Sequence, residues 1–68
     1  MDQLQLAGRI RAYRKLKGYT QSEFSAKLGV SVAVFGAVER GVRMPDAKLL
    51  RQIADALNID MHELAQQK

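Results

Sequence analysis

The stretch from residue 21 to residue 40 constrains the fold more than any other part of the chain. Its apolar residues recur at helical spacing on both sides of Gly29. They are Phe24 and Leu28, four residues apart, and Phe35 and Val38, three residues apart. Because glycine readily adopts the positive φ that ends a helix, Gly29 marks a tight turn. The spacing therefore predicts two short helices, at 21–28 and 32–40, that meet at this turn.

Both expected helix starts also carry capping residues. Thr20 and Glu23 form the pattern T-x-x-E, a capping box in which each side chain bonds to the backbone N–H of the other residue. Ser31 can cap the second helix in the same way. A helix, a short turn that contains a glycine and a second capped helix make up a helix-turn-helix unit, whose second helix enters the DNA major groove in many DNA-binding proteins.

The flanking segments predict three more helices. One covers 4–17, with Leu6, Ile10 and Tyr13 apolar at helical spacing, and ends at Gly18. Another covers 47–57, capped by Asp46. A last helix opens with a second capping-box pattern, D-x-x-E from Asp60 to Glu63. The expected core consists of Ile10, Tyr13, Phe24, Leu28, Val30, Phe35, Val38, Leu50, Ile53, Leu57 and Leu64.

Length and composition agree with an all-α fold. Sixty-eight residues suit a single domain at 1–68, and 47% hydrophobic content with 6% aromatic residues suits a compact helical bundle. The absence of cysteine excludes a disulfide framework and a thiolate metal site. No stretch has the length of a signal peptide or a membrane span, so we expect a cytoplasmic, nucleoid-associated protein with no membrane partner.

The charge balance favours acidic partners. Eleven Lys and Arg against seven Asp and Glu give a net charge of +4, and nucleic acid is the commonest partner of a small basic domain. The same charge could also serve only to keep a small domain soluble. An enzyme is not expected, because His62 stands alone without a catalytic constellation, and no phosphate-binding glycine loop, cofactor site or metal-ligand cluster is recognisable.

Four separated motifs resemble the phage repressor/Cro superfamily, also called the XRE-type family, of small bacterial and phage regulators. They are GRIRAYRKLKGYTQ near the start, LGVS at the turn, VERG at the end of the third helix, and P-D-x-x-x-L-x-x-I-A-x-A-L after it. The resemblance covers about residues 6 to 65. It implies a compact, lambda repressor-like domain of five helices, and a sequence-preferring transcriptional regulator, typically a repressor, that binds operator DNA as a homodimer.

The resemblance also nominates site residues. Members of the family commonly have a buried ion pair at the positions of Arg14 and Glu39. They use the glutamine at the position of Gln21 to contact a DNA phosphate and to brace the recognition helix. The basic residues that would accompany Gln21 are Arg40, Arg43 and Lys27. For each of these three, an ordinary solvated charge is the alternative.

The outward face of the third helix departs from the family pattern. On a helical wheel that turns Phe35, Val38 and Glu39 inward, the outward positions are Val32, Ala33, Gly36, Ala37 and Arg40, with Ser31 before them. Family members usually read bases there with polar side chains, which are needed for bidentate hydrogen bonds to guanine or adenine. Three explanations remain open: contact with thymine methyls combined with readout of DNA shape, weakly specific binding, or an apolar surface that meets a protein.

The third explanation defines an alternative function. In it, the chain is a protein-interaction module on a helix-turn-helix fold, an anti-repressor or antitoxin-like adaptor with little direct reading of DNA. Apolar residues at Leu16, Val42 and Leu49 indicate a protein contact, most simply a homodimer that uses these residues or the last helices.

Overall fold

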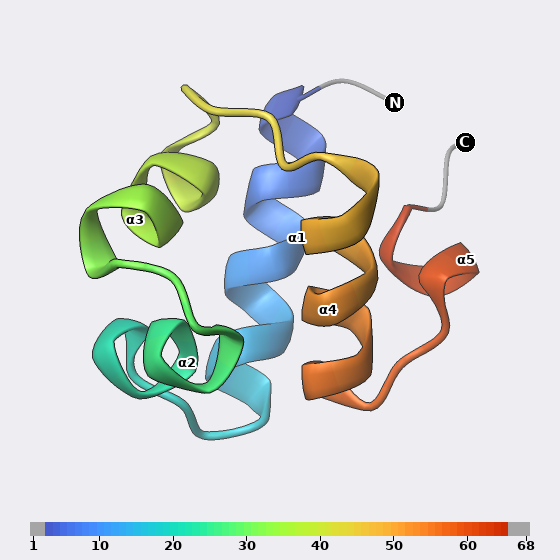
Figure 1. Cartoon of the computed structure of the whole chain (residues 1–68). Coiled ribbons are helices and arrows are strands. Elements are labelled where there is room, and N and C mark those ends of the chain that lie inside the picture. Colours follow the sequence, from blue (N-terminus) through green and yellow to red (C-terminus); the bar gives the residue numbers. More distant parts are fainter. Residues whose placement is uncertain (1–2, 66–68) are drawn as a thin grey trace.

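The computed structural model describes residues 3–65, which form five helices and no strand (Figure 1). The helices are α1 (Gln3–Leu16), α2 (Gln21–Leu28), α3 (Val32–Arg40), α4 (Ala47–Leu57) and α5 (Met61–Leu64). The predicted all-α class and the order of the five helices are confirmed. The first helix begins and ends one residue earlier than the sequence predicted. None of the helices in this described part is long and apolar enough to cross a membrane.

Helix α1 is the centre of the domain. It runs through the middle of the molecule and packs against α3, α4 and α5, while α2 packs against α3 and α4 (Figure 1). The helix-turn-helix formed by α2 and α3 therefore lies on one side of α1, and α4 and α5 lie on the other. The recognition-helix candidate α3 is held from behind by α1 and from one side by α2.

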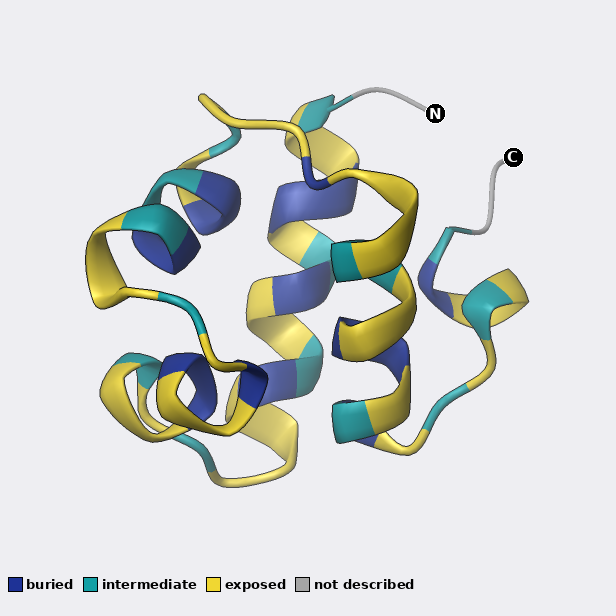
Figure 2. Ribbon diagram, in the orientation of Figure 1, coloured by how far each residue is buried: buried dark blue, intermediate teal, exposed yellow. Residues whose placement is uncertain are grey.

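The core fills the space between these helices, and the buried side of each helix turns toward the middle of the molecule (Figure 2). Eight of the eleven residues expected in the core are buried there, and Tyr13, Val30 and Leu50 are half-buried against it. Phe24 of α2 and Phe35 of α3 lie in ring contact, with centroids 5.3 Å apart. This contact fixes how the two helices of the unit meet.

The predicted caps of the helix-turn-helix are present. The Thr20 hydroxyl accepts a hydrogen bond from the Glu23 amide at 3.0 Å, and the Glu23 carboxylate accepts one from the Thr20 amide at 2.9 Å. Gly29 ends α2 at φ 76°, and the Ser31 hydroxyl caps α3 by accepting from the Val34 amide at 3.1 Å. These bonds satisfy backbone groups that helix ends leave unpaired, so the turn is fixed in one conformation.

The second predicted capping box is wrong. The Asp60 carboxylate accepts from the His62 amide at 2.8 Å, one residue earlier than a capping box requires. An N-cap aspartate can bond to either the second or the third amide of a helix, and the choice of the second leaves Glu63 out of the cap.

The start of α1 supports the end of α3. The Gln3 side-chain amide donates to the Gly41 carbonyl at 2.6 Å. Gly41 ends α3 at φ 78°, and a Cβ at this position would lie 2.6 Å from Cδ2 of Leu4. Both the positive φ and the close approach of Leu4 therefore favour glycine here.

Candidate nucleic-acid interface

A buried ion pair joins α1 to α3. Nε of Arg14 lies 2.6 Å from Oε2 of Glu39, and Nη2 of Arg14 donates to Oε1 of Glu39 at 3.1 Å. The side chains are only 8% and 2% exposed, respectively. Two parallel N–H···O bonds between a guanidinium and a carboxylate fix the relative orientation of their helices as well as their separation.

Two further bonds extend this pair into a network. Nη1 of Arg14 donates to the Tyr19 carbonyl at 2.6 Å, and the Gln21 side-chain amide donates to Oε1 of Glu39 at 2.9 Å. Within residues 3–65, no buried side-chain nitrogen or oxygen is left without a hydrogen bond. The network thus ties α1, the connection before α2, the first residue of α2 and the end of α3 together. It braces α3 from the inner side.

One of the two roles expected for Gln21, the bracing of α3, is visible in this geometry. One N–H of its side-chain amide is used to brace Glu39, while its Oε1 lies near Gly36, 3.7 Å from where a Cβ would stand. The amide nitrogen carries a second N–H, which can donate to a phosphate. A phosphate at this place would also meet backbone amides at the start of α2, because a helix N-terminus favours anions.

The side chains on the outward face of α3 before Arg40 are short, but not every residue of this face is exposed to solvent. Val32 is 45% exposed, Ala33 is exposed and Ala37 is half-buried. The expectation that Gly36 presents an open surface is wrong, because Gly36 is buried. A Cβ there would lie 3.2 Å from Nη1 of Arg40. With no side chain of its own, Gly36 is covered by Arg40 of the same helix and Gln21 of α2.

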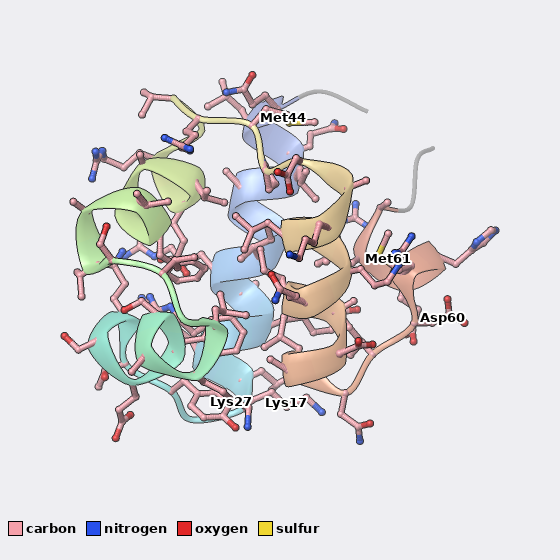
Figure 3. The ribbon with its side chains drawn as sticks, in the orientation of Figure 1. Lys17, Lys27, Met44, Asp60 and Met61 are labelled. Carbon is pink, nitrogen blue, oxygen red and sulfur yellow. The ribbon has the colours of Figure 1, made fainter. Side chains whose placement is uncertain are left out.

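The basic residues do not all gather at this face. Arg40 is exposed at the end of α3, and Arg43 is exposed in the loop after it. Lys27 points elsewhere, with Nζ 5.9 Å from the centre of the Tyr19 ring. Lys27 and Lys17 both lie toward the lower edge of the molecule in this view, whereas residues 40–43 lie at the top (Figure 3). The structure thus places Arg40 and Arg43 at one end of α3 and leaves Lys27 apart from them.

Two features of the site were missed in the sequence. No sequence pattern indicates that Arg14 donates to the Tyr19 carbonyl, because every residue carries a backbone carbonyl. The contact of Arg40 with Gly36 could have been predicted from the sequence, because residues four apart share a helix face and long side chains lean toward the N-terminus of their helix.

Comparison with known proteins agrees with this geometry. A family model for a helix-turn-helix matches residues 10–64. The chain belongs to this helix-turn-helix family. It is 56% identical over 57 residues to YazB of Bacillus subtilis, an uncharacterized HTH-type transcriptional regulator, and the alignment spans 84% of this chain and 83% of YazB.

Two solved structures are similar to this helix-turn-helix domain. One is the restriction-modification controller protein C.AhdI from Aeromonas hydrophila, at 31% identity and a TM-score of 0.85, covering 90% of this chain and 92% of that one. The other is SinR, a master regulator for biofilm formation, in complex with DNA, at 33% identity and a TM-score of 0.81, covering 87% and 95%.

The exposed apolar side chains of the helix-turn-helix domain form more than one surface. Leu16, at the end of α1, is 76% exposed, and Val42, beyond the end of α3, is 70% exposed. The contact of Gly41 with Leu4 brings Val42 close to the start of α1, and Met44, 51% exposed, lies at that same end (Figure 3). Leu16 is thus separated from Val42 by the length of α1, and a partner that covers one does not automatically cover the other.

Proposed function

We propose that the chain is a sequence-preferring, DNA-binding transcriptional regulator, a repressor, that inserts α3 into the major groove. The observation that carries this proposal is the braced α3. Its inner side is fixed by the core and by the Arg14–Glu39 pair, and its outer side carries alanines that allow close approach to the bases. The similarity to SinR, whose structure contains DNA, supports the same docking geometry.

The proposed interface divides into positioning and reading residues. Backbone amides at the start of α2 and the guanidinium of Arg43 would contact phosphates, which fix the register of the protein on the duplex. Val32 and Ala33 would contact thymine methyl groups. The proposed set on this face is Gln21, Ser31, Val32, Ala33, Gly36, Ala37, Arg40 and Arg43. Lys27, expected from the sequence to join them, is left out because its ammonium lies over the Tyr19 ring, away from Arg40 and Arg43.

We further propose that the regulator acts as a homodimer of a single 1–68 domain in the cytoplasm, on the nucleoid. Helix α3 has nine residues, so it spans only about 13 Å and reads a few base pairs. Two-fold dimers of such domains bind half-sites about 34–36 Å apart. The longest dimension of the described domain, 30 Å, is shorter than that spacing, so one copy cannot occupy both half-sites.

A protein-interaction module remains the second candidate. It is favoured by the exposed Leu4, Val42 and Met44, at 68%, 70% and 51% exposure, beside an α3 face with few hydrogen-bonding side chains. In this alternative, the domain uses the helix-turn-helix fold to bind another regulator rather than an operator.

Anisotropy titration of labelled genomic DNA fragments at two salt concentrations separates the two functions. For DNA binding, we expect the affinity to fall steeply between about 50 and 200 mM salt, because bound phosphates release counterions. Arg43→Ala should weaken binding to all fragments alike and reduce the salt slope by about one charge, while Lys17→Ala, at the opposite edge, serves as the charge-matched control. No binding at the lower salt concentration would contradict the proposal and favour the protein-interaction module.

A further inference from the structure

The side chain of Arg40 lies where a base-reading side chain from position 36 would otherwise stand. Gly36 is buried, and a Cβ built there would be 3.2 Å from Nη1 of Arg40, closer than ordinary van der Waals contact. Residues four apart lie on the same helix face, and a long side chain leans toward the preceding turn. The guanidinium therefore returns from the end of α3 to the middle of its outward face.

This guanidinium has unused donors. Within residues 3–65, Arg40 takes part in no hydrogen bond or ion pair. The carboxylate of Glu39, the acid next to it in the chain, is already bonded by Arg14 and Gln21. The positive charge of Arg40 is thus left for a ligand outside the described domain.

We propose that Arg40 reads a guanine in the major groove and that Gly36 is the residue that makes this reading possible. The inference rests on the proposed DNA-binding function and assigns a specific base to it. A guanidinium can donate to O6 and N7 of guanine together, and this bidentate contact is the commonest specific contact between proteins and DNA. From the sequence, Arg40 was expected both to accompany Gln21 at a phosphate and to lie on the outward face of α3. The position of its guanidinium beside Gly36, over the middle of the helix, favours the second role.

The neighbours of Arg40 favour a base over a phosphate. Ala33 and Ala37 on the same outward face have side chains of one carbon each, so nothing long separates the guanidinium from the floor of the groove. On the other side of Gly36, Oε1 of Gln21 lies 3.7 Å from the same Cβ position. The amide of Gln21 is held by its bond to Glu39 at 2.9 Å, so it limits how far the guanidinium can swing.

Selection from a randomised DNA duplex pool, followed by sequencing, tests the assignment. We expect the wild type to select one guanine per half-site, and Gly36→Ala to lower the preference for that guanine about two- to threefold, because the new Cβ shifts the end of the Arg40 side chain. Arg40→Lys keeps the charge but lacks the planar fork, so it should weaken the preference for the same guanine less than Arg40→Ala does. The double variant Gly36→Ala, Arg40→Ala should select the same motif as Arg40→Ala alone.

A second helical glycine supplies the matched control. A Cβ at Gly8 would meet nothing within 4 Å, so Gly8→Ala should select the wild-type motif. Both alanine variants should melt at or above the wild-type temperature, because alanine favours helix and the atom displaced by Gly36→Ala is the end of a flexible side chain. A weaker selection of guanine by a folded Gly36→Ala variant therefore cannot be attributed to unfolding.

Replacement of the selected guanine by 7-deazaguanine separates base contact from phosphate contact. The substitution removes only the N7 acceptor, so it should weaken wild-type binding and leave Arg40→Ala unaffected. If Arg40→Ala changes only the salt slope and keeps the motif, or if Gly36→Ala keeps the full wild-type preference for that guanine, the assignment is wrong. If the wild type binds DNA but selects no guanine, the inference fails while the proposed function stands. Only a wild type that binds no DNA defeats the proposed function itself.

Discussion

Removal of Glu39 should destabilise the domain more than truncation of any charged side chain outside the Arg14–Glu39 pair in the described part. Glu39→Ala deletes two hydrogen bonds from Arg14 and one from Gln21. It leaves the buried guanidinium of Arg14 with the Tyr19 carbonyl as its partner. Because a lone charge that stays buried is strongly unfavourable, the expected cost is about 3–5 kcal/mol.

That cost is large relative to the stability of so small a domain. At about 0.05–0.15 kcal/mol per residue, 68 residues give a free energy of unfolding of about 3–10 kcal/mol. For domains of this size, each kcal/mol lowers the melting temperature by about 4–8 °C. Glu39→Ala should therefore melt at least about 12 °C below the wild type, and it should not fold at all where the cost exceeds the free energy of unfolding of the wild type.

Urea unfolding followed by circular dichroism measures this free energy directly. Glu63→Ala, which truncates an exposed glutamate on α5, should change the free energy of unfolding by less than about 0.5 kcal/mol. The double variant Arg14→Met, Glu39→Leu removes both charges and should recover much of the loss, because a buried ion pair contributes little net stability over apolar packing. Equal, small effects of Glu39→Ala and Glu63→Ala would refute the reasoning.

Three other outcomes are expected. Gly41→Ala should lower the free energy of unfolding by about 1–2 kcal/mol, because φ is 78° there and Leu4 lies against the new Cβ. Gly8→Ala should raise it by about 0.5–1 kcal/mol, so thermal melts should show a lower melting temperature for the first variant and a higher one for the second. Ala33→Gln should create a preference for adenine at one position per half-site, visible in selection from a randomised pool and absent if α3 does not face the bases. Sedimentation should detect a homodimer on a saturated palindromic site, and a monomer both free and on that DNA would exclude it.

The sequence was sufficient for most of the fold because the determining interactions are local. Helical spacing, caps and left-handed glycines act within a few residues, and they predicted α2, α3 and α4 to the residue. The Arg14–Glu39 pair spans 25 residues, and its prediction rested on the family resemblance.

The site was less predictable because its key contacts depend on the conformations of long side chains. A helical wheel treats Gly36 as open surface, although side chains from another turn and another helix cover it. Lys27 lies over the Tyr19 ring, which belongs to the connection before its helix, and no periodicity indicates that contact. Likewise, Leu16 and Val42 are both exposed, but only the fold reveals that they lie at different ends of α1.

The two sides of α3 contribute differently to the stability of the domain. Phe35, Val38 and Glu39 hold the helix from within, while Val32, Ala33 and Ala37 add little to that hold. In the proposed interface, substitutions at the latter three positions would therefore change which operator is recognised while the folded fraction of the protein stays nearly constant. A lineage of such regulators can acquire new target genes by single steps, each of which passes through a stable protein.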